Sequence, residues 1–140
     1  MDGRFLRNEM LWGAEAQARL AAAHIIVFGL GGVGSYVVEC LARSGVGELT
    51  LVDSDTVALS NLNRQLEALG STVGQPKAEA VARRIGDINP AAVLHPMQAH
   101  YGAETRELFF PEGCHYDYIV DAIDLVSCKL DLAETARQLG

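Results

Sequence analysis

Cysteine is scarce in this chain, which has three among 140 residues. Cys40, Cys114 and Cys128 are widely spaced and form no CxxC pair, so the pattern predicts neither a disulfide framework nor a zinc knuckle. Cys40 lies in an apolar helical run, which predicts a buried side chain. Cys114 and Cys128 are expected to be partly exposed, and nothing beside them in sequence marks a nucleophile.

Long apolar runs are also missing. Charged residues interrupt every candidate before it reaches the roughly 20 residues that a membrane-spanning helix needs. The first ten residues are polar and mixed in charge, unlike a signal peptide. We therefore expect a cytoplasmic protein with no membrane span in this segment.

Positive charge is in deficit, since 11 Lys and Arg face 18 Asp and Glu for a net charge of −7. This balance argues against a broad nucleic-acid surface within the segment, although an RNA substrate held elsewhere stays compatible with it. The hydrophobic fraction of 49% is typical of a globular protein, and the length suits one domain.

What the chain does contain is a regular alternation of strand and helix patterns. We expect strands at 24–28, 48–52, 92–99 and 116–120, and helices at 15–23, 33–43, 77–88, 104–110 and 127–139. Such alternation predicts an α/β fold: a Rossmann-like, doubly wound, mostly parallel sheet with helices on both faces. The chain stops where another strand is expected, so residues 1–140 are interpreted as the N-terminal part of a longer domain, with an arm at 1–13 and a nucleotide-binding core at 24–140.

A glycine-rich loop follows the first strand and opens a helix, with the sequence Gly29-Leu30-Gly31-Gly32-Val33-Gly34. Glycines there permit a tight turn and let backbone N–H groups approach a phosphate. Asp53 ends the second strand, where its carboxylate can accept hydrogen bonds from ribose hydroxyls. The loop predicts nucleotide binding but leaves NAD, FAD and ATP open.

Cations after the second strand favour ATP. Arg64 lies in a Ser60–Gln65 segment and Lys77 opens a helix, and a triphosphate needs such positive charge more than a dinucleotide does. The helix dipole disfavours a lysine at that position, which weakens a purely structural reason for it. Asp121 and Asp124 follow the fourth strand, where carboxylates can hold Mg²⁺. Helix capping by Asp124 is the alternative.

Five ordered motifs carry a resemblance to a known family: GLGGVGS, LTLVDSD, SNLNRQ, VGQPK and DAID. The chain resembles the adenylating family of ubiquitin-activating enzymes and their bacterial relatives in thiamin and molybdopterin biosynthesis. The resemblance covers nearly the whole chain. It implies an ATP-dependent enzyme in which a carboxylate attacks the α-phosphate, pyrophosphate leaves, and an acyl-adenylate forms; whether 140 residues alone suffice for turnover stays open in the sequence.

The resemblance also implies roles for single residues. Asp53 would hold the ribose, and Asp124 would bind Mg²⁺ and position the attacking group. An arginine near the N-terminus, Arg7 or alternatively Arg4, would reach the ATP site of the partner subunit in a homodimer. The other nucleotide-binding positions implied are Gly29, Gly31, Gly32, Gly34, Asp55, Asn61, Arg64, Gln65 and Lys77.

Within the family, the likeness is greatest to the branch of tRNA threonylcarbamoyladenosine dehydratases, because of the DAID motif, the segment from Asp87 to Pro90, and Tyr36 after the glycine loop. That branch implies a tRNA substrate whose threonylcarbamoyladenosine is cyclised. One alternative is an adenylyltransferase that activates the C-terminus of a ubiquitin-like sulfur carrier. Another, from a different class, is an NAD(P)-dependent oxidoreductase.

Overall fold

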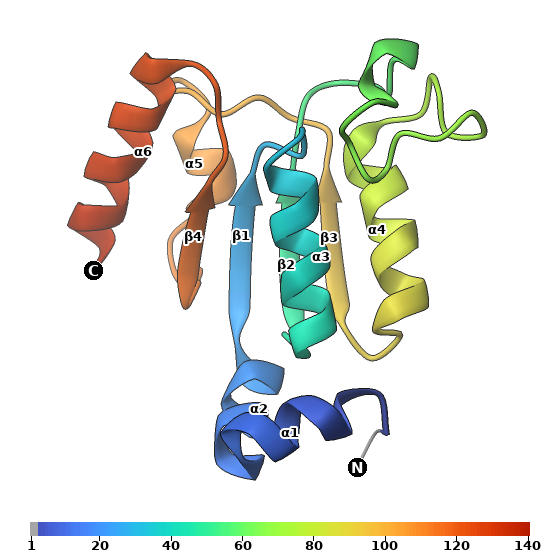
Figure 1. Cartoon of the computed structure of the whole chain (residues 1–140). Helices are drawn as coiled ribbons and strands as arrows, with labels where there is room; N and C mark the ends of the chain where they lie inside the picture. The colour runs from blue at the N-terminus through green and yellow to red at the C-terminus, as the bar shows by residue number, and fades with distance from the viewer. Residues whose placement is uncertain (1–2) are drawn as a thin grey trace.

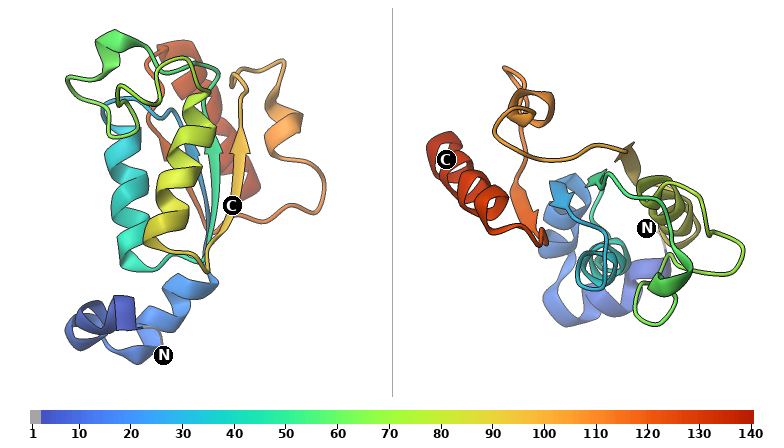
Figure 2. Two further views of the ribbon diagram at one scale, coloured as in Figure 1. Left: turned by 90° about the vertical axis from the view of Figure 1, so that its right-hand side faces the viewer. Right: turned by 90° about the horizontal axis from the view of Figure 1, so that it is seen from above.

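The structure is a computed structural model that describes residues 3–140. It contains a single parallel sheet with helices on both sides (Figures 1 and 2). The strands are β1 His24–Phe28, β2 Glu48–Val52, β3 Val93–Met97 and β4 Tyr118–Asp121. The α-helices are α1 Leu6–Trp12, α2 Ala14–Ala22, α3 Gly34–Ser44, α4 Lys77–Ile88, α5 Arg106–Phe109 and α6 Val126–Leu139. Two short 3-10 helices lie at Gly3–Phe5 and Leu59–Asn61.

The strand order is β3-β2-β1-β4, and every pair is parallel. Each parallel connection needs a crossover, and the helices between strands supply it. The carboxyl ends of all four strands therefore point the same way, toward the top of Figure 1. The expected α/β fold with a doubly wound parallel sheet is confirmed.

Two apolar cores fill the space between the sheet and its helices. On one face, Val27 and Leu51 pack against Val38 of α3 and Ile85 of α4. On the other face, Phe28 lies in an aromatic group with Tyr101 and Phe109, which Leu132 of α6 completes. Residues 25–28 of β1 are covered on both faces and form a continuous apolar run in the sequence, whereas in β2 the polar Glu48 and Thr50 alternate with leucines.

The predicted elements agree with the structure most closely at β1, β2 and α4, whose bounds are the expected ones. The fourth strand starts at Tyr118 and not at residue 116. Asp117 lies before it because its Oδ2 accepts a hydrogen bond from the backbone N–H of His24 at 2.8 Å, and the Tyr116 ring packs edge-on against His24. The third strand and α5 are likewise shorter than predicted.

The prediction for Cys40 is wrong, since its side chain is exposed. Helix α3 turns Val38 and Ala42 toward the sheet, four residues apart, and a residue midway between them faces solvent. Cys128, expected to be partly exposed, is buried beside Leu132 in the aromatic core, whereas Cys114 is exposed as expected.

Of the arm predicted at 1–13, residues 1 and 2 lie outside the described residues, and the rest is mostly helical, although no helix was predicted before residue 15. Arg7 was predicted to precede the first helix, but it lies within α1, which packs against α2 at the amino ends of the strands (Figure 1). Asn8 Nδ2 donates to the carbonyl of Arg43 at 2.7 Å, and the ring of Phe5 lies beside Gly45, so the arm has local partners. Between residues 3 and 140, no helix has the length and apolar character to cross a membrane.

Candidate nucleotide-binding cleft

A cleft of about 640 Å³ opens at the carboxyl ends of β1, β2 and β4. From β1 the chain passes to β2 and β3 on one side, and after β3 it crosses back to β4 on the other side of β1. Ligands of doubly wound sheets bind where the strand order reverses in this way. The cleft brings together ten of the residues singled out in the sequence: Gly29, Gly31, Gly32, Asp53, Asp55, Asn61, Arg64, Gln65, Lys77 and Asp124.

The loop glycines fall into two classes. Gly29 has φ +91°, and a Cβ there would lie 2.4 Å from the carbonyl oxygen of Ala122. A Cβ at Gly34 would lie 1.7 Å from the carbonyl oxygen of Gly29. These two positions are glycine because the backbones meet.

Gly31 and Gly32 have no such internal reason. The atoms nearest to an added Cβ belong to the side chains of Gln65 and Arg64, at 3.6 Å in both cases, which is ordinary van der Waals contact. Their missing side chains therefore leave room in the cleft, directly before the N-terminus of α3. The first N–H groups of a helix lack intrahelical partners and bear partial positive charge, so this room suits an anion.

Asp53 joins two strand ends. Its Oδ2 accepts from the N–H of Leu30 in the glycine loop, and its Oδ1 accepts from the N–H of Asp55, both at 2.8 Å. Each carboxylate oxygen has a second lone pair, so the side chain can still accept bonds from a ligand.

Lys77 is almost fully buried at the floor of the cleft, with its side chain 7% exposed. Its Nζ lies 3.7 Å from Asp55 Oδ2, whose own side chain is largely exposed. The N–H of Lys77 also donates to the carbonyl of Asp55 at 3.0 Å, which links the start of α4 to the loop after β2. The described residues give this buried ammonium one ion pair, with the exposed carboxylate of Asp55, so a further anion suits it.

Glu67 is a charged residue near the cleft that the sequence did not single out. Its residue exposure is 2%, and neither carboxylate oxygen has a hydrogen-bond partner among the described residues. Burial raises the pKa of Glu67, and the nearby positive charge of Lys77 offsets part of that rise. The sequence feature that could have indicated a buried glutamate is its isolated position among the apolar residues of Leu66–Leu69, directly after the Ser60–Gln65 segment.

The Ser60–Gln65 segment begins in the 3-10 helix Leu59–Asn61 and continues as a turn, and its Asn61, Arg64 and Gln65 line the cleft. Asn61 is buried, and its Oδ1 accepts from the N–H of Ala58 at 2.9 Å, so this side chain stabilises the turn. Arg64 is exposed and donates from Nη1 to Ser60 and Asn63, which leaves much of its guanidinium toward the cleft. Gln65 is buried, and its Oε1 has no partner among residues 3–140.

The two aspartates after β4 differ. Asp121 forms an ion pair with Lys129 at 3.0 Å and accepts from the N–H of Ile123 at 3.0 Å, and it does not line the cleft. Asp124 lines the cleft, and its carboxylate makes no hydrogen bond or ion pair with the part of the chain that the structure describes. Of the two aspartates, only Asp124 therefore has a carboxylate available to a ligand.

Besides Asp121, three predicted residues lie outside the cleft of their own chain. Gly34 packs beneath the loop, whereas Arg7 on α1 and Arg4 just before this helix are exposed at the other end of the sheet. The cleft also has an apolar wall that the sequence did not predict, because it is assembled from separate segments. This wall includes Phe28, Ala99, Tyr101, Ile123 and Leu125.

Comparisons with known proteins agree with this geometry. A sequence model of the ThiF family matches residues 5–140. A tRNA threonylcarbamoyladenosine dehydratase of Bacillus subtilis is 47% identical over 129 residues, which span 92% of this chain and 50% of the relative. A molybdopterin-synthase adenylyltransferase of Salmonella typhimurium is 37% identical over 131 residues, 92% of this chain and 51% of the relative.

Among solved structures, the Escherichia coli tRNA N6-threonylcarbamoyladenosine dehydratase in complex with ATP superposes with a TM-score of 0.91 at 41% identity. That similarity covers 96% of this chain and 55% of the other. The chain thus spans about half the length of the curated relatives it matches.

Proposed function

Since this chain belongs to the ThiF family, we propose that it binds ATP and supplies the adenylating half of an enzyme that dehydrates threonylcarbamoyladenosine in tRNA. The observation that carries the proposal is the cleft, where Arg64, Lys77 and Asp124 surround a glycine loop with room for phosphates. A tRNA substrate would place the enzyme in the cytoplasm.

In the proposed complex, the phosphates lie over Gly31 and Gly32 at the N-terminus of α3, and Asp53 accepts from the ribose hydroxyls. The apolar wall beside Phe28 suits the adenine ring. The guanidinium of Arg64 and the buried ammonium of Lys77 offset the triphosphate charge, in a cleft where charge interactions are stronger than in water.

Asp124 is the residue that would hold Mg²⁺. The fit rests on its free carboxylate, since Mg²⁺ is commonly bound by one or two carboxylates together with substrate phosphates and water. The ion would neutralise charge on the phosphates when bound. Asp121 is already paired with Lys129, so we assign it no metal role.

The reaction follows from what ATP can do to a carboxylate. A carboxylate oxygen of the threonyl group attacks the α-phosphorus, the bond to the pyrophosphate oxygen breaks, and an acyl-adenylate forms. A nucleophilic atom of the same substrate then attacks the activated carbonyl carbon and closes the ring. AMP leaves with one of the former carboxylate oxygens and the nucleophile gives up its proton, so the substrate loses the elements of water overall. The chain's part is to orient the triphosphate and stabilise the charge that develops on it.

We also propose a homodimer in which Arg7 or Arg4 acts in the cleft of the partner. Helix α1 lies at the opposite end of the sheet from the cleft of its own chain, so its arginine is out of reach there. Met10 and Leu11 on the same helix are 73% and 81% exposed, and an interface would bury them.

The nucleotide test compares ATP with Mg²⁺ against NAD by calorimetry. We expect ATP to bind at least tenfold more tightly. Tighter binding of NAD would favour the oxidoreductase alternative and reject the proposal.

The catalytic test uses the full-length protein that contains this chain. Asp124→Asn should abolish ATP–pyrophosphate exchange without loss of fold, whereas Asp121→Asn, three residues earlier, is the matched control and should retain exchange. Near-normal exchange in Asp124→Asn would contradict the assignment.

Subunit mixing tests the dimer. An Asp124→Asn chain mixed with an Arg4→Ala, Arg7→Ala chain should regain partial activity if the arginine acts across the interface. No recovery after confirmed subunit exchange would mean that it does not. Product analysis with modified tRNA and with a sulfur carrier would separate the two adenylating branches, since molybdopterin-synthase adenylyltransferases are also similar to this chain.

A further inference from the structure

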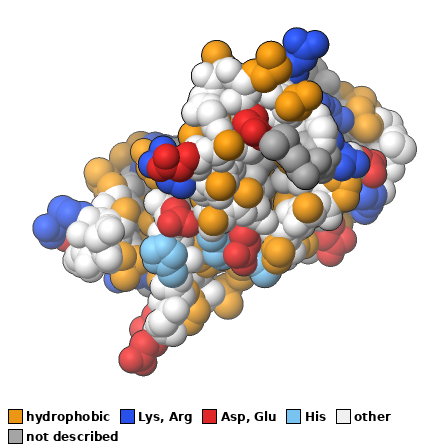
Figure 3. Space-filling model, turned by 90° about the horizontal axis from the view of Figure 1, so that it is seen from below, with side chains coloured by type: hydrophobic (Ala, Val, Ile, Leu, Met, Phe, Trp, Pro, Cys, Tyr) orange, Lys and Arg blue, Asp and Glu red, His pale blue; other side chains and the backbone are white. Residues whose placement is uncertain are grey.

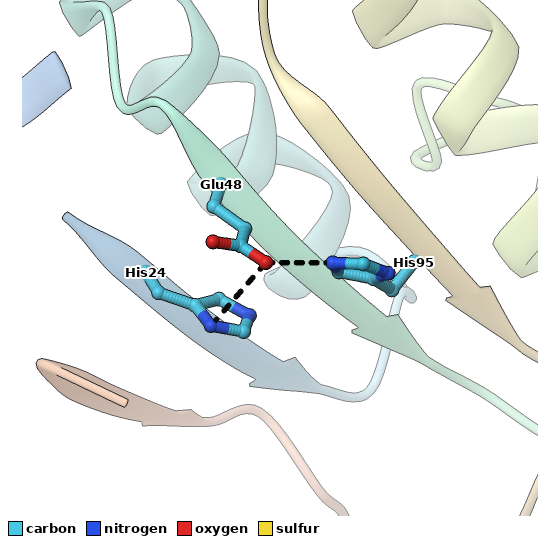
Figure 4. Close-up of side chains that lie close together, drawn as sticks. All are labelled: His24, Glu48 and His95. Carbon is cyan, nitrogen blue, oxygen red and sulfur yellow. Dashed lines mark hydrogen bonds and ion pairs between the residues drawn. The ribbon is translucent and has the colours of Figure 1, made fainter. Parts of the chain in front are cut away.

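A second group of polar side chains lies at the amino ends of the strands, opposite the nucleotide cleft. It consists of His24, Glu48 and His95, one from each of three adjacent strands (Figure 4). No motif connects these residues, because they are 24 and 47 positions apart in the chain.

The strand register explains why they meet. His24 pairs with Glu48 across β1 and β2, and His95 pairs with Thr50 across β2 and β3. Glu48 and Thr50 are two residues apart on one strand, so they point to the same face of the sheet. All three side chains therefore project from one face, and this is the face whose other end carries the aromatic core around Phe28.

The ligand atoms are close together. His95 Nε2 lies 2.7 Å from Glu48 Oε1, and His24 Nδ1 lies 3.6 Å from the same oxygen. One nitrogen or oxygen from each residue lies within 4.8 Å of the others. Ligand atoms of a tetrahedral zinc ion are separated by about 3.3 Å, given metal–ligand distances near 2.0–2.1 Å. Small side-chain rotations would bring this trio to that spacing.

His24 is held in the orientation that a ligand needs. Its Nε2 lies 2.9 Å from Thr50 Oγ1, and its ring packs against Tyr116 with centroids 4.7 Å apart. These contacts leave Nδ1 directed at Glu48. Metal-binding histidines commonly have such a partner on the second ring nitrogen, which fixes the ring and its tautomer.

The trio is open to solvent on one side. The side chain of His24 is 20% exposed, that of Glu48 38% and that of His95 46%. Figure 3 shows this end of the molecule from below, where histidine and acidic side chains gather on the surface. A metal ion could therefore enter, and water could fill the coordination position that the protein leaves open.

We propose that His24, Glu48 and His95 bind one divalent transition-metal ion of the zinc class. Two imidazoles and one carboxylate favour such ions over Mg²⁺ and Ca²⁺, which prefer oxygen ligands. The alternative is that Glu48 and His95 form only a hydrogen bond. That alternative does not explain why His24 is directed at the same carboxylate oxygen and is held there by its contact with Thr50. The site lies at the other end of the sheet from the cleft, so it stands independently of the proposed adenylation.

Calorimetric titration of the 140-residue chain with Zn²⁺, without nucleotide, tests the stoichiometry. We expect one ion per chain, and a visible absorption band on titration with Co²⁺ that reports nitrogen and oxygen ligands. His95→Gln and Glu48→Gln, both at partly exposed positions, should each weaken Zn²⁺ binding at least tenfold.

His115→Gln is the matched control, because His115 is an exposed histidine near the same end of the sheet but outside the trio. It should change the affinity less than twofold. Zn²⁺ should also raise the Tm of the unchanged chain and not that of His95→Gln. Equal affinity in His95→Gln and His115→Gln, or a stoichiometry well below one, would overturn the proposal.

Discussion

At the carboxyl ends of β1, β2 and β4 the polar side chains come from loops, whereas at the amino ends of β1, β2 and β3 they come from the strands themselves. The loop residues lie near one another in sequence in short motifs, such as Gly29–Gly34 and Ser60–Gln65. His24, Glu48 and His95 share no motif and are neighbours only because three strands pair in one register. A ligand site built on loops can be recognised in the sequence, and one built across strands requires the sheet.

The largest expected effect separates glycines needed by the fold from glycines needed by the ligand. Gly34→Ala would place a Cβ 1.7 Å from the carbonyl oxygen of Gly29, and we expect it to cost about 3 kcal/mol of unfolding free energy or more. Gly31→Ala should stay within about 0.5 kcal/mol of the unchanged chain but weaken ATP binding at least tenfold. Urea unfolding and calorimetry measure both, and equal destabilisation by the two changes would contradict this division.

The second prediction tests whether the two ends work separately. Arg64→Ala should weaken ATP binding by about 2 kcal/mol, or roughly 30-fold, because a charged hydrogen bond to a phosphate is lost. His95→Gln should leave ATP binding within twofold and weaken Zn²⁺ binding instead. Calorimetry on both variants with both ligands gives the four values, and a loss of ATP affinity in His95→Gln would show that the ends are coupled.

The third prediction concerns Glu67, which belongs to the cleft end. Because burial raises its pKa, the folded state holds this proton more tightly than the unfolded state. The free energy of unfolding is highest below the pKa that Glu67 has in the unfolded state, because the carboxyl is then protonated in both states. It falls as pH rises through the pKa of the folded state. Glu67→Gln should therefore raise stability on the order of 1 kcal/mol at pH 8, with a gain that shrinks toward zero below pH 4. Urea unfolding across that range checks it, and a constant difference would exclude titration of Glu67.

The smallest expected effect lies between the two ends, where α3 meets α4. Hydrogen bonds from Arg84 and Arg43 lower the pKa of Glu39, so its stabilising effect is present at neutral pH and is lost as pH falls through the folded pKa. Glu39→Gln should cost about 0.5 kcal/mol at pH 7 and nothing at pH 2, and should leave ATP and Zn²⁺ binding unchanged. A change in either affinity would mean that these helices transmit strain to the sites.

The fold could be predicted in large part because strand and helix periods are local properties of the chain. The apolar run of β1, the alternation of leucine with Glu48 and Thr50 in β2, and the proline before α4 are local patterns, and these elements have the expected bounds. Element ends that depend on distant partners were less accurate, as at Asp117, which bonds to His24 across 93 residues. The burial of Cys40 was predicted wrongly because an apolar run does not indicate which face of the helix packs against the sheet.

By itself, the sequence determined the parallel α/β fold, the glycine loop and the polar half of the cleft lining, since each of these depends on side chains close together in the chain. Tertiary structure decided what depends on the pairing of distant segments. It placed Asp124 in the cleft and paired Asp121 with Lys129, and it buried Glu67 beside Lys77. It also placed Arg7 at the end of the sheet opposite the cleft and brought His24, Glu48 and His95 together. The physical reason is that strand register and burial are set by contacts across the whole sheet, which no local pattern specifies.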